Sequence, residues 1–132
     1  MRVLAGFLLA VGLCASATAS SVYLQCEAIG YAYSYEKKVF YESMKVDFQY
    51  KSTRGCQLDG GRTHAKNEWR SYFSSEVPEY FKYTLGVKSD CECHDDPPSG
   101  VARSHQDFKR DFVRKNFSVK RLYGFDPEDS EF

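Results

Sequence analysis

The clearest pattern in the chain is the alternation of side chains over residues 22–35. One set of alternate positions carries small or apolar residues, namely Leu24, Cys26, Ala28, Gly30 and Ala32. The other set is rich in aromatic residues, namely Tyr23, Gln25, Glu27, Ile29, Tyr31, Tyr33 and Tyr35. Period-two alternation with many aromatic residues predicts a β-strand.

A second alternating stretch at 39–50 follows a short polar break at 36–38, which predicts an antiparallel hairpin. On one face of this second strand we expect Phe40, Met44, Val46, Phe48 and Tyr50. Further along, apolar residues at helical spacing predict a helix that begins near Thr63 and ends before Pro78. Their stripe consists of Ala65, Trp69, Tyr72 and Phe73.

The remaining chain predicts a strand at 86–93, a helix at 101–116 and a last strand at 117–125. The expected order of elements is therefore β-β-α-β-α-β. A two-layer packing suits this order, so we predict an α+β fold. In that fold a mainly antiparallel sheet carries two helices on one face, and two disulfides hold a single small domain.

The first residues have the three parts of a secretion signal. Arg2 supplies a positive charge, 3–13 is an apolar run of eleven residues, and 14–19 is made of small residues. A membrane-spanning helix needs roughly twenty apolar residues, so we expect a cleavable leader at 1–19 and no membrane anchor after cleavage. Cleavage leaves residues 20–132, with an acidic tail at 126–132.

The charge of the chain bears on its partners. The sequence has 18 basic and 18 acidic residues, and the leader takes Arg2 with it, which leaves 17 against 18. General nucleic-acid binding usually needs a basic surplus, so we do not expect it. The basic stretch at 103–121 is expected to be a solvated helix face, and contact with an acidic partner or nucleic acid is the alternative.

Four cysteines follow the leader: Cys26, Cys56, Cys91 and Cys93. An even number in a small exported domain predicts disulfides. A bond between Cys91 and Cys93 would be strained, so Cys26 and Cys56 should each bond to one member of that pair, in either arrangement. A zinc site within residues 91–96, completed by Cys56 and His64, is the alternative. Export favours oxidised thiols, so we predict no metal and no cofactor.

Three histidines, His64, His94 and His105, could supply acid–base catalysis. They would support the alternative hypothesis of a secreted effector or hydrolase that resembles a ribonuclease. No nucleophile, metalloprotease or phosphate-loop motif accompanies them. We therefore assign no catalytic residue from the sequence.

Four tyrosines near the hairpin are candidates for binding: Tyr31, Tyr33, Tyr35 and Tyr41. If both helices cover one face of the sheet, these side chains project from the other, where aromatic residues often anchor a partner. The alternative is that they pack as cross-strand pairs and stiffen the hairpin.

The layout resembles that of small exported bacterial proteins of uncharacterised function. The matching segments are 22–28 with its Cys, the aromatic helix segment 69–73 and the Cys-bearing strand end 91–93. The chain departs from the pattern at Gly124-Phe125, where a terminal Trp is expected. The resemblance implies the fold and the compartment, and it implies no active site.

These observations lead to one functional hypothesis. We expect an exported, non-enzymatic binding protein in the periplasm or the secreted fraction, and its partner to be another protein. An inhibitor or immunity protein would have these properties.

Overall fold

The computed structural model describes residues 22–93 and 96–127. The predicted leader, most of the acidic tail and His94 lie outside the described residues. The elements in chain order are β1 (Val22–Ser34), β2 (Val39–Ser43), β3 (Val46–Ser52), α2 (Asp59–Glu76), the 3-10 turn η1 (Tyr80–Lys82), β4 (Thr84–Glu92), α3 (Val101–Arg114) and β5 (Ser118–Leu122). This arrangement is the predicted α+β fold, with a five-stranded, mostly antiparallel sheet.

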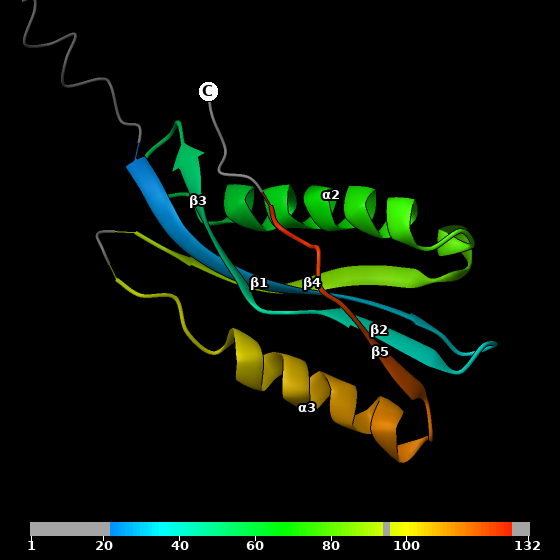
Figure 1. Cartoon of the computed structure of the whole chain (residues 1–132). Coiled ribbons are helices and arrows are strands. Elements are labelled where there is room, and N and C mark those ends of the chain that lie inside the picture. Colours follow the sequence, from blue (N-terminus) through cyan, green and yellow to red (C-terminus); the bar gives the residue numbers. More distant parts are fainter. Residues whose placement is uncertain (1–21, 94–95, 128–132) are drawn as a thin grey trace, which may run out of the picture.

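The long strand β1 lies in the middle of the sheet (Figure 1). On one side it pairs with β4 along residues 25–33. On the other side it pairs first with β3 and then with β2. The last strand, β5, lies parallel to β2 and extends the sheet beyond it. The sheet therefore ends in β4 on one side, and in β3 and β5 on the other.

The single strand expected at 39–50 is in fact two strands, because a β-bulge interrupts it. Ala28 is opposite Val46 and Tyr31 is opposite Glu42, so three steps along β1 match four steps along its neighbour. The backbone N–H of Gly30 donates to Ser43 Oγ at 2.8 Å, and that hydroxyl donates to the Met44 carbonyl oxygen. The side chain of Ser43 thus replaces a ladder hydrogen bond that the extra residue removes.

The bulge reverses which residues share a face. Phe40 packs with Phe112 and Phe117, whereas Phe48 packs with Leu24 and Cys26 in a different cluster. The expectation that Phe40 shares a face with Val46, Phe48 and Tyr50 is therefore wrong. A one-residue insertion shifts the parity of a strand, and alternation alone does not reveal it.

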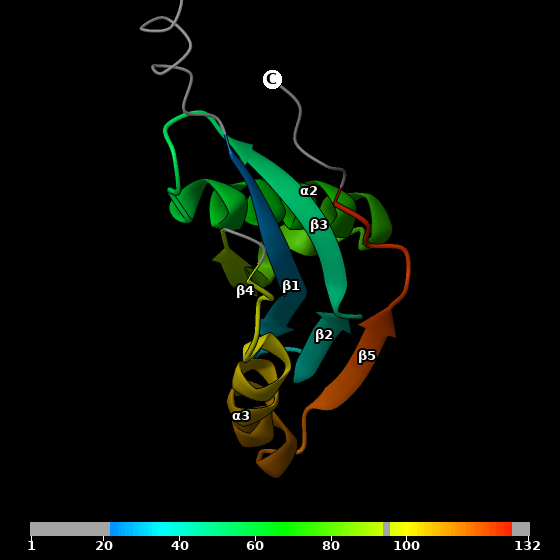
Figure 2. The same ribbon diagram turned by 90° about the vertical axis from the view of Figure 1, so that its left-hand side faces the viewer.

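The two helices cover opposite faces of the sheet, as Figures 1 and 2 show. Helix α2 packs on the face that carries Leu24, Cys26 and Ala32 of β1. Helix α3 packs on the other face, against Tyr31 and Tyr33. The prediction of two helices on one face is wrong in this respect. Both sets of alternate positions in β1 are largely apolar, so burial of each face of the strand under a helix is favourable. We call these the α2 face and the α3 face.

Two glycines allow α2 to approach the sheet closely. A Cβ atom on Gly30 would lie 2.2 Å from the indole ring of Trp69, which is fully buried and donates its Nε1–H to the Tyr31 carbonyl oxygen. A Cβ atom on Gly61 would lie 2.3 Å from the sulfur of Cys91. The helix begins at Asp59 rather than near Thr63 and so includes Gly60 and Gly61, and its close packing at Gly61 offsets the low helix propensity of glycine. Its end before Pro78 is as predicted.

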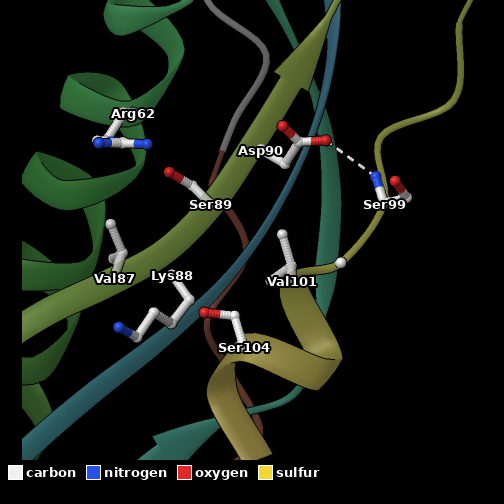
Figure 3. Close-up of a pocket in the computed structure, with 9 residues that line it drawn as sticks. Arg62, Val87, Lys88, Ser89, Asp90, Ser99, Val101 and Ser104 are labelled. Carbon is white, nitrogen blue, oxygen red and sulfur yellow. Dashed lines mark hydrogen bonds between the residues drawn. The ribbon is translucent and has the colours of Figure 1, made fainter. Parts of the chain in front are cut away.

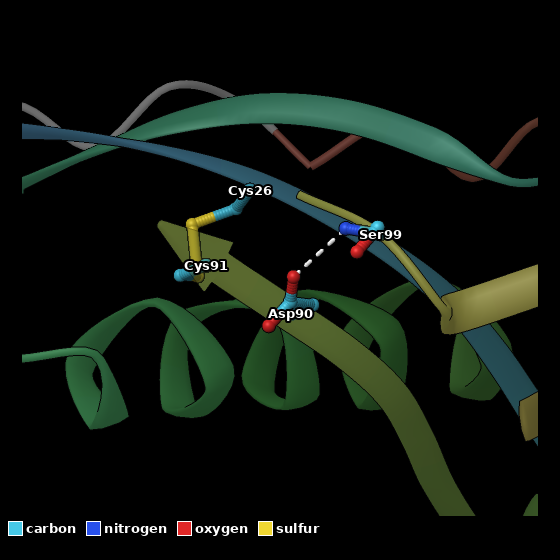
Figure 4. Close-up of a disulfide and its surroundings, with 4 residues drawn as sticks. All are labelled: Cys26, Asp90, Cys91 and Ser99. Atoms are coloured by element: carbon cyan, nitrogen blue, oxygen red, sulfur yellow. Dashed lines mark hydrogen bonds between the residues drawn. A yellow bond between two sulfur atoms is a disulfide. The ribbon is translucent and has the colours of Figure 1, made fainter. Parts of the chain in front are cut away.

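Two disulfides connect the elements, in one of the two predicted arrangements. Cys26 and Cys91 are bonded across the paired strands β1 and β4, next to α2 (Figure 4). Cys56 and Cys93 join the loop before α2 to the end of β4. The bonds span sequence separations of 65 and 37 residues. Each stabilises the fold by about 4 kcal/mol in the chain-entropy description.

Candidate functional site

A groove follows the outer edge of β4, between the two helices. Within residues 22–93 and 96–127, β4 pairs with β1 alone, so its second edge has no strand partner. The groove has a volume of about 370 Å³ and is drawn in Figure 3. It is lined by Arg62 of α2, by residues 87–90 of β4, and by Ser99, Gly100, Val101 and Ser104 at the start of α3.

Side chains of β4 alternate between the two walls of this groove. Ser89 is the register partner of Ala28 and points to the α2 side, where Arg62 lies (Figure 3). Lys88 and Asp90 belong to the α3 face. The Asp90 carboxylate accepts a hydrogen bond from the Ser99 backbone N–H at 2.9 Å, which holds the segment before α3 against the strand. Asp90 also raises the pKa of Glu92, because the two like charges repel.

Both cations at the groove lack a carboxylate partner in the described part of the chain. Neither Arg62 nor Lys88 forms an ion pair there. The Lys88 ammonium instead lies over the ring of Phe108, 4.5 Å from its centroid. Ser89 Oγ is buried and has no hydrogen-bond partner among the described residues. The groove thus combines a strand edge, two uncompensated positive charges and an unsatisfied hydroxyl.

A second polar cluster is buried under α3, around Glu42. The bulge places Glu42 on the α3 face, where its side chain is 3% exposed. His105 Nε2 lies 2.7 Å from Glu42 Oε1, Lys109 Nζ lies 3.1 Å from the same oxygen, and Arg121 Nη2 lies 2.9 Å from Oε2. Burial by itself raises the pKa of Glu42, but hydrogen bonds from His105, Arg121 and Lys109 outweigh it and lower the pKa to about 2.

This cluster is a structural network that ties α3 and β5 to the sheet. A carboxylate of such low pKa is ionised and can only accept, so His105 Nε2 donates to it. Histidine oriented by a carboxylate is a familiar arrangement for a general base. A general base must lie within hydrogen-bond reach of its substrate. The His105 side chain is only 2% exposed, so its ring does not offer that reach in this structure.

The structure does not bring the candidate histidines together. His64 lies on α2, near the rings of Phe48 and Tyr50, with ring centroids 5.6 and 5.9 Å away. His105 lies on the opposite face of the sheet, near Phe40. A mechanism that uses His64 and His105 on one substrate is incompatible with this separation. His94 lies outside the described residues.

The four candidate tyrosines do not form one exposed face. Tyr31 and Tyr33 are half-buried under α3, where their rings pack against Phe108 and Phe112. Tyr41 is half-buried on the other face, against Phe73 and Tyr83. Only Tyr35 of the four is exposed, at 59%. The sequence-based expectation of a tyrosine face open to solvent is therefore wrong, because α3 covers the face of the sheet that carries Tyr31 and Tyr33. A binding role for these residues stays a prediction.

The cysteines of the alternative zinc site are oxidised in the structure. Cys91 is bonded to Cys26, and Cys56 is bonded to Cys93, so none of these cysteines presents a thiolate. No group of three or more His, Cys, Asp or Glu side chains among residues 22–93 and 96–127 is placed to hold a metal ion.

Neither the Glu42 cluster nor the free edge of β4 was predicted from the sequence. A signal for the first was present: Glu42 occupies a position that shares its parity with Phe40 in an alternating strand. No signal for the second exists in local patterns. Strand order depends on contacts between segments far apart in the chain. The local sequence pattern of an edge strand does not distinguish it here from an inner strand.

Together the fold and these sites define a small, disulfide-bonded α+β domain with an open strand edge. No family model matches the chain, and neither the curated proteins nor the solved structures compared with it include a significant match. The resemblance to small exported bacterial proteins stays a prediction. The two disulfides indicate an oxidising compartment. Neither helix in the described part of the chain is long and apolar enough to cross a membrane.

Proposed function

We propose that this protein is an exported, non-enzymatic binding protein whose partner is another protein. The observation that carries the proposal is the outer edge of β4 in its groove, which pairs with no strand of the described residues and lies beside Arg62 and Lys88, neither of which has an ion pair among them. Strand edges are recurrent sites for binding polypeptide chains, because their backbone groups are ready to form hydrogen bonds. An inhibitor or immunity protein for an enzyme or toxin is the form of this function that we favour.

The compartment supports the proposal. Disulfides persist in oxidising surroundings, and the predicted leader at 1–19 would direct the chain there. We propose the periplasm or the secreted fraction as the location. A cross-linked domain suits this setting, because a rigid binding surface loses little conformational entropy when it meets its partner.

The test is affinity capture with the oxidised protein immobilised on a resin. An extract of the periplasm or the culture medium is passed over it, and bound proteins are eluted with an excess of free protein. We expect one protein to be retained, to be released by this competition, and to form a complex of defined stoichiometry when purified. Retention of nothing that the free protein can displace would contradict the proposal.

A further inference from the structure

We propose that the partner contributes an extended segment that adds to the sheet as a strand beside β4. This inference rests on the proposed binding function and specifies the chemistry of the partner. The segment carries two consecutive acidic residues, opposite Lys88 and Ser89, followed by a basic residue opposite Asp90. Three independent features of the groove support it: the backbone edge, the charges and the buried hydroxyl.

The backbone of β4 is suited to accept a strand. Residues 25–33 of β1 satisfy one edge of it, and the other edge lies open to the groove along 87–90. In a strand paired on one side only, alternate residues direct their N–H and C=O groups outward. Arg62 of α2 lines the groove on one face of this edge, and residues 99–101 and Ser104 at the start of α3 line it on the other.

The other edge strands of the sheet, β3 and β5, are weaker candidates. β5 has five residues and β3 has seven, compared with nine in β4. The cations in the middle of β5 are already engaged, because Arg121 binds Glu42 and Lys120 lies near the ring of Tyr41. Beside β4, by contrast, Arg62 forms no ion pair among the described residues.

The charges define which side chains the partner segment presents. In an added strand, the residue opposite a given β4 residue points to the same face of the sheet. The residue opposite Ser89 therefore points to the α2 side, where Arg62 has no carboxylate partner among the described residues. The residue opposite Lys88 points to the α3 side. Acidic side chains at these two positions compensate both cations.

The next residue of the added strand, opposite Asp90, is expected to be basic rather than acidic. Asp90 belongs to the α3 face, and its repulsion of Glu92 marks a negative potential at this end of β4. A basic side chain opposite Asp90 meets that potential. The buried Oγ of Ser89, which has no partner within the described ranges, can donate to the acidic residue that faces it. The expected order is therefore acidic, acidic, basic.

The test uses a heptapeptide of strand-forming residues around this order, Thr-Val-Glu-Glu-Lys-Val-Thr, together with the same residues in reverse order. Both orders are needed because the added strand can run in either direction. Binding to the oxidised protein is measured by NMR titration. We expect one of the two peptides to bind, and the peptide of the same order with Glu and Lys exchanged to bind at least tenfold more weakly.

Hydrogen exchange and a matched pair of variants then locate the site. Peptide binding should slow exchange at those β4 amides that exchange fast in the free protein. Arg62→Glu with Lys88→Glu should weaken binding about tenfold or more. Arg54→Glu with Lys120→Glu changes the charge equally outside the groove and should weaken binding less than twofold. Equal weakening by both pairs, or unchanged exchange in β4, would overturn the inference.

Two further outcomes separate this inference from the proposed function. A captured protein partner that binds wild type and the Arg62→Glu/Lys88→Glu variant equally overturns the strand-addition inference and leaves the binding function standing. Dimerisation of the free protein that this variant abolishes, without any peptide binding, assigns the edge to a second copy and also overturns the inference.

Discussion

Glu42→Gln tests the physical account of the α3 face most directly. The substitution keeps the size of the side chain but removes the charge that His105, Lys109 and Arg121 surround. Glu42 is 3% exposed and Lys109 is 14% exposed, so water screens little of their interaction, whereas Arg121 is 45% exposed and its interaction is screened more. Removing one partner from a buried charge network leaves the others without compensation, and that loss is usually severe.

The magnitude follows from the pKa of Glu42. Its folded value of about 2, against an ordinary value of 4.5, means that the native environment favours the ionised form. At 1.36 kcal/mol per pH unit, this difference contributes about 3 kcal/mol to the free energy of unfolding at neutral pH. We therefore expect Glu42→Gln to lower the free energy of unfolding by about 3 kcal/mol. For a domain of this length, the loss corresponds to a midpoint roughly 10 °C lower.

The sign of the pH dependence is also determined. Because the folded pKa of Glu42 is depressed, its contribution is complete above pH 4.5 and disappears as the pH falls from 4.5 to about 2. The free energy of unfolding of wild type should fall as the pH is lowered through this interval. For Glu42→Gln the fall over the same interval should be smaller by about 3 kcal/mol. Urea unfolding at a series of pH values, with the disulfides intact, measures both quantities.

Glu79 provides the control. Its pKa is also lowered to about 2, by hydrogen bonds from Lys37 and Lys82, but its side chain is 48% exposed. Solvent and salt screen such a pair, so Glu79→Gln should leave the free energy of unfolding nearly unchanged. If Glu42→Gln destabilises the protein no more than Glu79→Gln, or leaves the acid profile as in wild type, the account of the buried network is refuted.

Three other substitutions probe the features that hold the sheet together. Gly30→Ala places a Cβ atom 2.2 Å from the ring of Trp69 and should destabilise the fold by about 3 kcal/mol in urea unfolding, because the buried indole must move. Ser43→Ala leaves the backbone N–H of Gly30 without its acceptor and should cost about 1–3 kcal/mol in the same assay. Replacing both Cys26 and Cys91 by Ser removes a disulfide that spans 65 residues and should cost about 4 kcal/mol.

Each of these three substitutions has a control or an outcome that would contradict it. Gly124→Ala places a Cβ atom 3.1 Å from the exposed end of Tyr72, so it should cost much less than Gly30→Ala. Ser74→Ala removes an exposed hydrogen bond to the Ser71 carbonyl oxygen and should change stability by less than about 0.5 kcal/mol. The disulfide prediction fails if the double Ser variant unfolds at the same urea concentration as wild type.

Much of the fold follows from local patterns in the sequence. Alternation predicted β1 over 22–35, and the strand ends at Ser34. Pro78 predicted the end of α2, and the helix stops at Glu76 with Val77 in an extended conformation. The cysteine count predicted two disulfides between the Cys26/Cys56 pair and the Cys91/Cys93 pair. These features depend on backbone sterics, on periodicity within one segment or on the geometry of neighbouring cysteines, all of which are present in the linear chain.

The candidate site depended on tertiary structure. The bulge between Ser43 and Val46 is decided by how β1 matches its neighbour, and with this register Glu42 lies on the α3 face beside His105. The coverage of both sheet faces is decided in the same way, because the tyrosines of β1 suit either solvent or a helix. The open edge of β4 exists only once the strand order is set. Side-chain type and spacing along the chain determine which elements form, whereas register and strand order arise from contacts between distant segments.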